Sequence, residues 1–296
     1  MTSIMSFPER GTYGNNKWRG NTSGFVIKEI IEHFKPKLFV DVCEGSGTSR
    51  DVCKELKIDY VGLDLYKGQD FTKDYILKQL PRQADVCFSH FPYHDMIKYS
   101  GEVYGDIPLN GDTSRCDTPE EFIAKSQVAL MNQREATKSG GIYATLIGDQ
   151  RGGSLGKGNF RSYQSDFIQM MPKEELLSVT IKLQHNCLSD NRQYFGSFIP
   201  IMHEYLLLWK KSEKSIFAIS FDIAKDIQKQ VATTWRNAIR IIMMKLGKAP
   251  LDVIYQEVEK VASNLVANNP NWKAKIRQQL QKHHTNVGRG VWAVAA

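Results

Sequence analysis

The chain has 296 residues, of which 42% are hydrophobic and 24% are charged, proportions typical of a globular protein with a sizeable core. No apolar run reaches the length of a membrane span, and residues 1–10 lack the apolar core of a secretion signal. The five cysteines form no CxxC pair, and His185 and His203 also lack metal-ligand spacing. We therefore expect a cytoplasmic protein with reduced thiols, no membrane partner and no bound metal.

The net charge of +7 is unevenly distributed along the chain. Residues 225–296 contain twelve Lys and Arg against four Asp and Glu, whereas residues 1–224 have a net charge of −1. A concentrated positive region is the electrostatic footprint expected for a polyanionic partner. The alternative is a solvated basic surface that only aids solubility.

Residue patterns predict an alternating series of strands and helices. In chain order we expect a loop at 1–24, a helix at 25–34, a strand at 38–43, a helix at 48–57, a strand at 60–65, a helix at 72–80, a strand at 85–89, a helix at 119–138, and strands at 141–148, 175–185 and 201–210. Such alternation predicts βαβ units, an α/β fold and a mainly parallel sheet. The last two strands suit an antiparallel hairpin at the sheet edge. Ligands of such sheets bind at the carboxyl ends of the strands.

The first informative signature joins a strand, a glycine turn and a helix. The predicted strand 38–43 runs into Glu44-Gly45-Ser46-Gly47, and a helix follows. Glycine lets the backbone approach a ligand closely, and a helix start offers free backbone N–H groups. Asp64, at the end of the next predicted strand, is placed to accept hydrogen bonds from a ribose diol. The alternative is a structural turn beside a solvated Asp64.

The details of this turn argue against a phosphate-rich ligand. The pattern is not GxGxxG, and no lysine stands where a phosphate-cradling loop would need one. Asp41 and Glu44 would repel phosphate. A ligand with a ribose and a cationic, phosphate-free end fits better, and S-adenosylmethionine is such a molecule.

The second signature ends the predicted strand 85–89 and reads His90-Phe91-Pro92-Tyr93. Methyl transfer to an exocyclic base amine requires an extruded base, an aromatic face that stacks on it, and acceptors for the amine N–H groups. Tyr93 would be the stacking platform. The His90 side chain and the Phe91 carbonyl would be the acceptors, and Pro92 would stiffen the turn. The alternative for His90 is a strand-end residue that caps a loop.

With these residues, the sequence resembles the S-adenosylmethionine-dependent DNA amino-methyltransferases, whose hallmark is Asp, Asn or Ser followed by Pro-Pro and an aromatic residue. A subset with His at the first position is similar to this chain. The resemblance extends over roughly residues 7–211 and includes the segments 14–24, 140–143, 148–151 and 203–206. It implies a Rossmann-like methyltransferase fold and a prokaryotic, mobile-element or phage origin. The cofactor segments precede the catalytic segment, an order that the family uses mostly for adenine.

The resemblance and the two signatures together predict the site. The catalytic residues are expected to be His90, Phe91, Pro92 and Tyr93. The cofactor-binding residues are expected to be Trp18, Arg19, Gly20, Asn21, Asp41, Glu44, Gly45, Ser46, Gly47, Asp64 and Leu65. Phe91 departs from the family pattern because it replaces the first proline. Its backbone carbonyl remains, but its larger side chain could distort or fill the amine pocket.

The C-terminal quarter predicts a small second domain. Amphipathic helices are expected at 235–247, 250–266 and 272–284, followed by a turn at 288–290 and a strand at 291–294. Three helices followed by a β-hairpin make a winged helix-turn-helix, and this segment is similar to such modules of restriction and modification proteins. The predicted domains are thus 1–211, a linker at 212–230, and 231–296.

A winged helix places basic residues against DNA. With the flexible basic segment 152–161, the predicted DNA-contacting residues are Lys157, Arg161, Lys273, Lys275, Arg277, Lys282 and Arg289. The alternative for segment 152–161 is a disordered surface loop. The alternative for the winged helix is a role in protein contacts.

The leading hypothesis is therefore a DNA methyltransferase of a modification system that flips a base from double-stranded DNA and methylates its amine, most simply adenine N6. The alternative is a catalytically degenerate DNA-binding subunit that works with a second protein subunit in a modification or defence complex. A methyltransferase for RNA or protein amines is the third interpretation.

Overall fold

The computed structural model describes residues 1–156, 158–185, 199–213 and 235–294, and it divides the chain into two compact units. The first contains Met1–Gln169 and Lys173–Glu213, and the second contains Met170–Pro172 and Lys214–Ala296. Most of the predicted linker 212–230 lies outside the described residues. No helix in the described part of the chain is long and apolar enough to cross a membrane.

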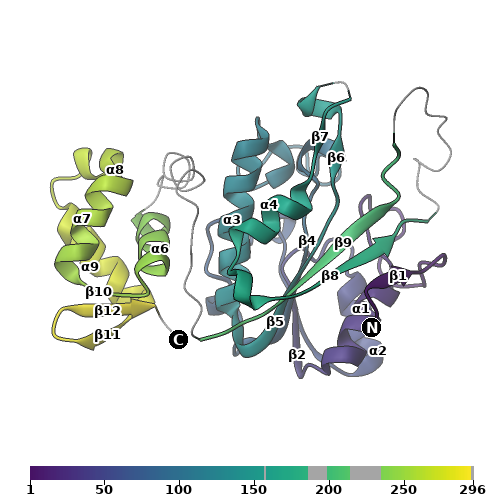
Figure 1. Ribbon diagram of the computed structural model, residues 1–296, viewed down its shortest axis with the longest axis horizontal. Helices are drawn as coiled ribbons and strands as arrows, with labels where there is room; N and C mark the ends of the chain where they lie inside the picture. Colours follow the sequence, from purple (N-terminus) through teal and green to yellow (C-terminus); the bar gives the residue numbers. More distant parts are fainter. Residues whose placement is uncertain (157, 186–198, 214–234, 295–296) are drawn as a thin grey trace. The chain divides into compact units, whose positions relative to one another are not determined.

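The first unit is built on a sheet with the strand order β1-β8-β9-β5-β4-β2-β3 (Figure 1). The strands span β1 (Ile4–Ser6), β2 (Leu38–Asp41), β3 (Asp59–Gly62), β4 (Ala84–His90), β5 (Thr137–Ile147), β8 (Leu176–Leu183) and β9 (His203–Lys210). β9 runs antiparallel to both of its neighbours, β5 and β8, whereas the other paired strands of this sheet are parallel. This topology confirms the predicted α/β fold with a mostly parallel sheet and an antiparallel hairpin towards its edge.

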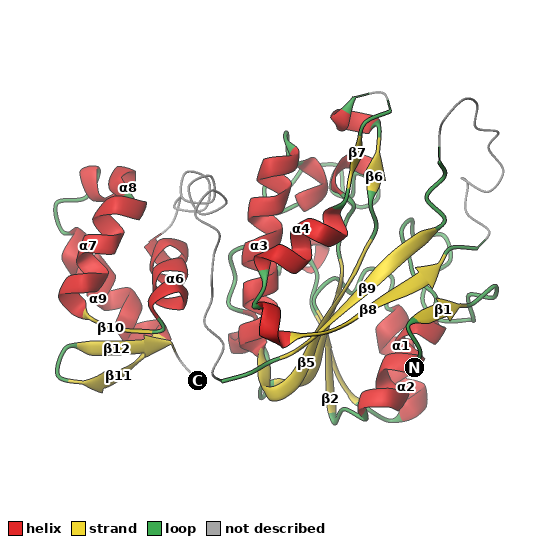
Figure 2. Ribbon diagram, in the orientation of Figure 1, coloured by secondary structure: helices red, strands yellow, loops and turns green. Residues whose placement is uncertain are grey.

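Helices α1 (Gly24–Phe34) and α2 (Thr48–Leu56) pack on one face of the sheet (Figures 1 and 2). The Ser23 hydroxyl accepts from the backbone N–H of Phe25 and so caps the start of α1. The apolar residues of α1 recur at helical spacing, and Val26 and Ile30 are fully buried against the sheet. Burial of each such side chain contributes about 1.5–3 kcal/mol.

The opposite face of the sheet packs against α3 (Pro119–Ala136), and α4 (Tyr163–Met170) lies on the same side (Figure 1). The side chain of Gln133 on α3 donates to the carbonyls of Cys87 at 2.6 Å and Ala144 at 2.8 Å. On this face Tyr143 and Trp209 stack with ring centroids 5.3 Å apart. Because helices cover both faces of the sheet, successive residues of β4 such as Val86, Cys87 and Phe88 are all buried.

Two local predictions for this unit were wrong. Residues 72–80 do not form one helix, since only a 3₁₀ turn at Ile76–Gln79 is present. The Asn132 side chain instead accepts from the Ile76 N–H and donates to the Phe71 carbonyl, which replaces helical hydrogen bonds. The predicted N-terminal loop contains β1, which pairs in parallel with β8. The segment 152–161, predicted to be a flexible loop, ends in β7 (Phe160–Arg161), which pairs with β6 (Gln150–Arg151) in a short antiparallel hairpin.

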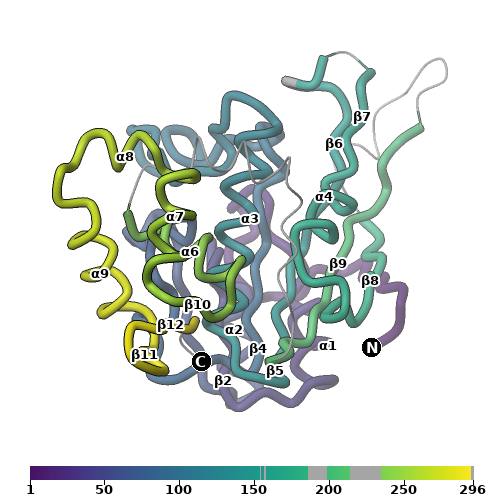
Figure 3. Tube along the Cα trace, turned by 60° about the vertical axis from the view of Figure 1, so that its left-hand side comes forward, coloured from purple at the N-terminus to yellow at the C-terminus, as the bar shows by residue number. Residues whose placement is uncertain are grey.

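The second unit combines helices with a three-stranded antiparallel sheet in the order β10-β12-β11 (Figure 3). Its elements are α6 (Trp235–Leu246), β10 (Lys248–Pro250), α7 (Leu251–Val261), α8 (Ser263–Ala267), α9 (Trp272–His283), β11 (His284–Gly288) and β12 (Val291–Val294). Ile254, Ile276 and Leu280 are fully buried in its core. The helix predicted at 250–266 is interrupted at Ala262, and β10 was not predicted. The winged-helix assignment stays a prediction.

Candidate active site

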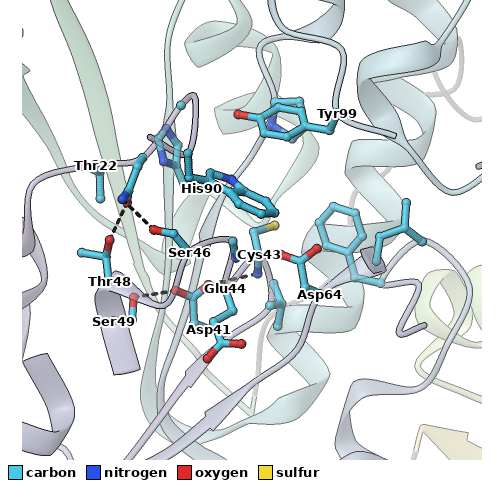
Figure 4. Close-up of a pocket in the computed structure, with 18 of the residues that line it drawn as sticks. Thr22, Asp41, Cys43, Glu44, Ser46, Thr48, Ser49, Asp64, His90 and Tyr99 are labelled. Carbon is cyan, nitrogen blue, oxygen red and sulfur yellow. Dashed lines mark hydrogen bonds between the residues drawn. The ribbon is translucent and has the colours of Figure 1, made fainter. Parts of the chain in front are cut away.

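A pocket lies at the carboxyl ends of β2, β3 and β4, where an α/β sheet binds its ligands (Figure 4). Nine of the eleven predicted cofactor residues line it: Trp18, Gly20, Asn21, Asp41, Glu44, Gly45, Ser46, Asp64 and Leu65. Arg19 and Gly47 do not line this pocket. Arg19 is exposed and lines a second pocket next to it. Gly47 adopts φ +87°, a left-handed conformation that residues with a side chain rarely adopt, so this glycine serves the turn itself.

The glycine turn is held from within by Asp41, which is 3% exposed. Its carboxylate accepts from the Cys43 backbone N–H at 2.9 Å and from the Ser49 hydroxyl at 2.5 Å (Figure 4). Burial raises the pKa of Asp41 to about 7, although these two hydrogen bonds act in the opposite direction. Asp41 therefore shapes the loop in addition to lining the pocket.

Asp64 follows β3 and fixes the opposite wall of the pocket. Its Oδ2 accepts from the Gly45 N–H at 2.8 Å, and its Oδ1 accepts from the Tyr66 N–H at 3.2 Å. Burial raises the pKa of Asp64 to about 6, and hydrogen bonds from Gly45, Tyr66 and Leu65 oppose this rise. Each carboxylate oxygen has two lone pairs, so Asp64 retains acceptor capacity for a ligand hydroxyl.

Glu44 is buried beside the same turn and is neutralised by two cations. It pairs with Lys67 and lies 3.8 Å from Arg50 Nη1. Its carboxyl carbon would lie 2.4 Å from a Cβ at position 62, so Gly62 is needed for Glu44 to enter the wall. Glu44 thus contributes a compensated charge to the pocket.

The predicted N-terminal segment 14–24 reaches the glycine turn through Asn21. The Asn21 amide donates to the Ser46 hydroxyl at 2.6 Å, and its carbonyl accepts from the Thr48 hydroxyl. Trp18 stacks on Tyr104 with centroids 6.1 Å apart and an interplanar angle of 14°. Trp18 and Tyr104 therefore form an aromatic wall that faces the glycine turn. Tyr104 belongs to the long polar loop after the catalytic motif, and no residue of that loop was predicted to belong to the site.

The second pocket adjoins the first. Both pockets are lined by Trp18, Gly20, Asn21, His90, Pro92 and Tyr99. The second is also lined by Phe91, Tyr93 and Glu204. All four predicted catalytic residues therefore line the second pocket, and His90 and Pro92 lie where the two pockets meet.

His90 ends β4, and its Nε2 lies 3.0 Å from the Tyr93 hydroxyl. Burial lowers the pKa of His90 to about 4, with Glu204 opposing and Lys182 reinforcing the shift. The imidazole is therefore neutral at pH 7, as an acceptor of an amine N–H must be. Tyr93 packs on Gly148, where a Cβ would lie 2.6 Å from the tyrosine ring.

Phe91 does not plug the first pocket. Its side chain is 1% exposed and packs against Phe71 and Phe167, with ring centroids 5.1 and 5.2 Å away. The substitution for proline thus supplies a core side chain. Phe91 also lines the second pocket, and the expected distortion or filling of the amine pocket stays a prediction. His94, directly after the motif, is buried and adopts φ 49°, which turns the chain at this point.

Several lining residues escaped the sequence reasoning. Tyr99, Tyr104, Asp112 and Thr113 belong to the long polar loop after the motif and line the first pocket. Asp112 is buried, and its carboxylate accepts hydrogen bonds from the backbone N–H and hydroxyl groups of Ser100 and Ser114. Asp and Ser residues at such short spacing could have indicated an ordered loop.

The predicted DNA-contacting residues fall into three groups. Lys157 lies outside the described residues. Arg161 is half-buried and pairs with Glu120 and Asp166, both at 2.9 Å, so its guanidinium is already engaged. The remaining five are exposed in the second unit: Lys273, Lys275, Arg277, Lys282 and Arg289. Among the described residues, no group of three or more His, Cys, Asp or Glu side chains could hold a metal ion.

No family model matches the sequence, and no curated protein matches it. Among solved structures, human N-acetylserotonin methyltransferase in complex with S-adenosylmethionine is 14% identical with a TM-score of 0.35, and the match covers 64% of this chain and 51% of that chain. A candidate DNA modification methylase from Thermus thermophilus, solved with S-adenosylmethionine, is 14% identical with a TM-score of 0.34, covering 58% and 72%. A methyltransferase from Archaeoglobus fulgidus is 13% identical with a TM-score of 0.37, covering 66% and 96%.

The chain thus spans about half the length of the human enzyme that it matches. The printed descriptions of these three structures all name methyltransferases or a methylase.

Proposed function

We propose that this protein is an S-adenosylmethionine-dependent DNA methyltransferase that acts on an exocyclic base amine, most simply adenine N6. One observation carries the proposal. A pocket lined by the glycine turn and Asp64 adjoins a pocket lined by Tyr93, and His90 and Pro92 line both. This arrangement suits a reaction that joins a nucleoside cofactor to a planar amine.

The first pocket has the groups that S-adenosylmethionine requires. Asp64 would accept from the ribose hydroxyls, and Leu65 and the aromatic rings of Trp18 and Tyr104 offer surface for the adenine. Among the residues that the structure describes, no lysine or arginine lines this pocket, which suits a ligand without phosphate. When bound, the cofactor supplies an electrophilic methyl group on a sulfonium.

The second pocket has the groups that orient the acceptor. Tyr93 would stack on an extruded base, an interaction worth about 1–3 kcal/mol per base. Neutral His90 and the Phe91 carbonyl would accept the two amine N–H groups, so that the nitrogen lone pair points at the methyl carbon. S-adenosylmethionine held in the first pocket would supply the methyl group to this nitrogen, and the proton that the amine releases would pass to water. Positioning and orientation would then supply much of the rate enhancement.

Helix α9 would supply the contact with the DNA backbone. Its exposed lysines and arginine flank the buried Ile276 and Leu280, and Lys273 Nζ lies 5.2 Å from the centre of the Trp272 ring. Replacement of Lys273 and Lys275 by Glu should weaken duplex binding at least tenfold and reduce its salt dependence. Lys260→Glu on α7 changes an equally exposed lysine and is the matched control. Equal loss in both variants would contradict a specific α9 interface.

The direct test of activity incubates the full chain with mixed-sequence duplex DNA and methyl-labelled S-adenosylmethionine. We expect label in the DNA, and nuclease digestion with mass spectrometry should identify N6-methyladenine. His90→Ala should abolish transfer, whereas His33→Ala, an exposed histidine on α1, should not. N4-methylcytosine in the digest would correct the base assignment, and preferential labelling of RNA or peptide would correct the substrate class.

A failure to transfer the methyl group would distinguish the enzyme hypothesis from that of a catalytically degenerate DNA-binding subunit. If the protein binds cofactor and DNA but labels no substrate at saturating cofactor, the degenerate-subunit alternative replaces the proposal. Phe91→Pro distinguishes the cause, because activity that appears only in this variant would attribute the loss to the altered motif.

A further inference from the structure

We propose that Tyr99 is a specificity-determining residue whose hydroxyl donates a hydrogen bond to the ring nitrogen next to the target amine, which is N1 in adenine. This role rests on the proposed function and adds a contact with the ring of the extruded base. Tyr99 belongs to the long polar loop after the catalytic motif, and no sequence pattern assigned it a role.

The side chain of Tyr99 lies where the two pockets meet. Tyr99 lines both pockets, as His90 does. In the first pocket it lies on the side away from Asp41 (Figure 4). Its hydroxyl packs against Gly20, because a Cβ at that position would overlap the hydroxyl oxygen. Gly20 also lines both pockets, so the hydroxyl itself is at their junction.

The backbone on both sides of Tyr99 is anchored by hydrogen bonds. The Tyr99 N–H donates to Ser114 Oγ at 3.0 Å, and the Tyr99 carbonyl accepts from the Val103 N–H at 2.7 Å. Asp112, which is 4% exposed, accepts from the N–H and hydroxyl groups of Ser100 and Ser114 at 2.5 to 2.9 Å. The ring is thus held in place before a ligand arrives, which lowers the entropic cost of binding.

The Tyr99 hydroxyl is available to a ligand. In the part of the chain that the structure describes, no residue forms a hydrogen bond with this hydroxyl, although buried tyrosine hydroxyls usually have a partner. The side chain is half-buried. Burial raises the pKa of Tyr99, so the phenol keeps its hydrogen at neutral pH and can donate it.

Other side-chain donors that line both pockets are directed elsewhere. The Asn21 amide donates to the Ser46 hydroxyl at 2.6 Å and to a backbone carbonyl at 3.0 Å. The indole Nε1 of Trp18 lies against the glycine turn, 3.2 Å from a Cβ at Gly45. Among the described residues that line both pockets, Tyr99 is therefore the donor best placed for a group at the junction.

The chemistry of the target base identifies this group. His90 and the Phe91 carbonyl would accept the two amine N–H groups, and the lone pair of the amine nitrogen must stay free for the methyl group. The ring nitrogen next to the amine is an acceptor and needs a donor, which the Tyr99 phenol supplies. A base that presents an amine beside a ring acceptor would thus react better than a base that lacks either, because the site would be left with an unpaired polar group.

The base analogue 1-deazaadenine, in which CH replaces N1, tests this contact directly. The probe is a short duplex with the sequence that the labelling assay identifies, containing adenine or 1-deazaadenine at the methylated position. We expect Tyr99→Phe to lower kcat/KM for the adenine duplex roughly tenfold. On the 1-deazaadenine duplex it should have no further effect, because the hydrogen bond is already missing. If the methylated base is cytosine, 3-deazacytosine is the corresponding probe.

The matched control is Tyr104→Phe. Tyr104 is on the same loop and lines the first pocket but not the second. Its ring stacks on Trp18, and phenylalanine retains this ring. Any loss in Tyr104→Phe should therefore be equal for the adenine and 1-deazaadenine duplexes.

Two measurements without turnover distinguish this role from a structural one. Because no described residue pairs with the Tyr99 hydroxyl, Tyr99→Phe should melt at the temperature of the parent protein. Fluorescence anisotropy with S-adenosylhomocysteine present should show weaker binding of the adenine duplex by Tyr99→Phe and no additional weakening for the 1-deazaadenine duplex. A lower melting temperature with equal losses on both duplexes would indicate a structural hydroxyl.

An equally large loss on both duplexes, or an unchanged kcat/KM on the adenine duplex, would overturn the role of Tyr99. The parent protein would still methylate DNA in that case, so the proposed function would stand. If the parent protein labels no nucleic acid at all, the proposed function fails and the role of Tyr99 fails with it.

Discussion

The two pockets that meet at His90 are built in different ways. In the first, Asp41 and Asp64 accept hydrogen bonds from backbone N–H groups of the pocket's own turns. In the second, the His90 and Tyr93 side chains contact each other within one motif, and Glu204 lines the same pocket from β9. The first pocket is thus held by hydrogen bonds from side chains to the backbone, whereas the second is lined by side chains of strands that are far apart in the chain.

This difference indicates which parts of the two pockets can be predicted from the local sequence and which depend on tertiary contacts. A turn that is held by an Asp and two glycines can be recognised from the local sequence. Which residues of β4 and β9 lie at the same end of the sheet depends on strand register, so a shift of one strand would move its side chains relative to those of the other. Experiments can therefore ask whether the two pockets respond separately to substitution and to pH.

The largest expected effect concerns Phe91, which links the catalytic motif to the core. Phe91→Ala should reduce the free energy of unfolding by about 3–5 kcal/mol, because it leaves a cavity beside Phe71 and Phe167. Phe91→Leu should cost roughly 1.5 kcal/mol or less and retain methyl transfer, since the backbone carbonyl is unchanged. Denaturant unfolding and the labelling assay measure both. If Phe91→Leu is stable but inactive, the ring itself takes part in the second pocket.

Substitution of Asp64 should weaken the first pocket selectively. Asp64→Asn replaces acceptor lone pairs by an amide donor, and the loss of a charged hydrogen bond of about 1.5–3 kcal/mol corresponds to roughly 10–100-fold in affinity. Calorimetric titration with S-adenosylmethionine measures the change. The exposed Asp106→Asn is the control. Equal affinity in Asp64→Asn and the parent protein would remove Asp64 from the cofactor site.

The pH dependence of cofactor binding should reveal Asp64 as well. Burial raises its pKa to about 6, so the carboxylate is ionised above that pH and becomes protonated below it. Protonation removes an acceptor needed by the ribose, and affinity should therefore fall severalfold between about pH 7.5 and 5.5. Asp64→Asn should lack this component of the profile. If the affinity of the parent protein for S-adenosylmethionine rises as the pH falls, this prediction is wrong.

The smallest expected effect is the absence of a histidine inflection in the rate. Burial lowers the pKa of His90 to about 4, so its imidazole stays neutral from about pH 6 to 8. Single-turnover methyl transfer at saturating cofactor should show no inflection near the ordinary histidine pKa. An inflection there that disappears in His90→Gln would show that the imidazole titrates freely, and the second pocket would then be more solvated than the contacts imply.

Local sequence patterns predicted most strands of the first unit, the glycine turn between β2 and α2, the acidic residue after β3 and the motif at the end of β4. These features are local, because apolar periodicity, glycine and capping residues act over a few positions. The core helix α1 and the apolar face of α9 were likewise predictable from their spacing. The helix predicted at 72–80 was not, since Asn132 from a distant helix takes over its backbone hydrogen bonds.

Only the tertiary structure decided which side chains meet. The direction of the Phe91 ring, the arrival of Tyr104 against Trp18 and the alignment of Glu204 with His90 depend on packing and register between segments far apart in the chain. Such contacts cannot be predicted from the local sequence, because they depend on the burial of apolar side chains and on the requirement that every buried polar group finds a hydrogen-bond partner.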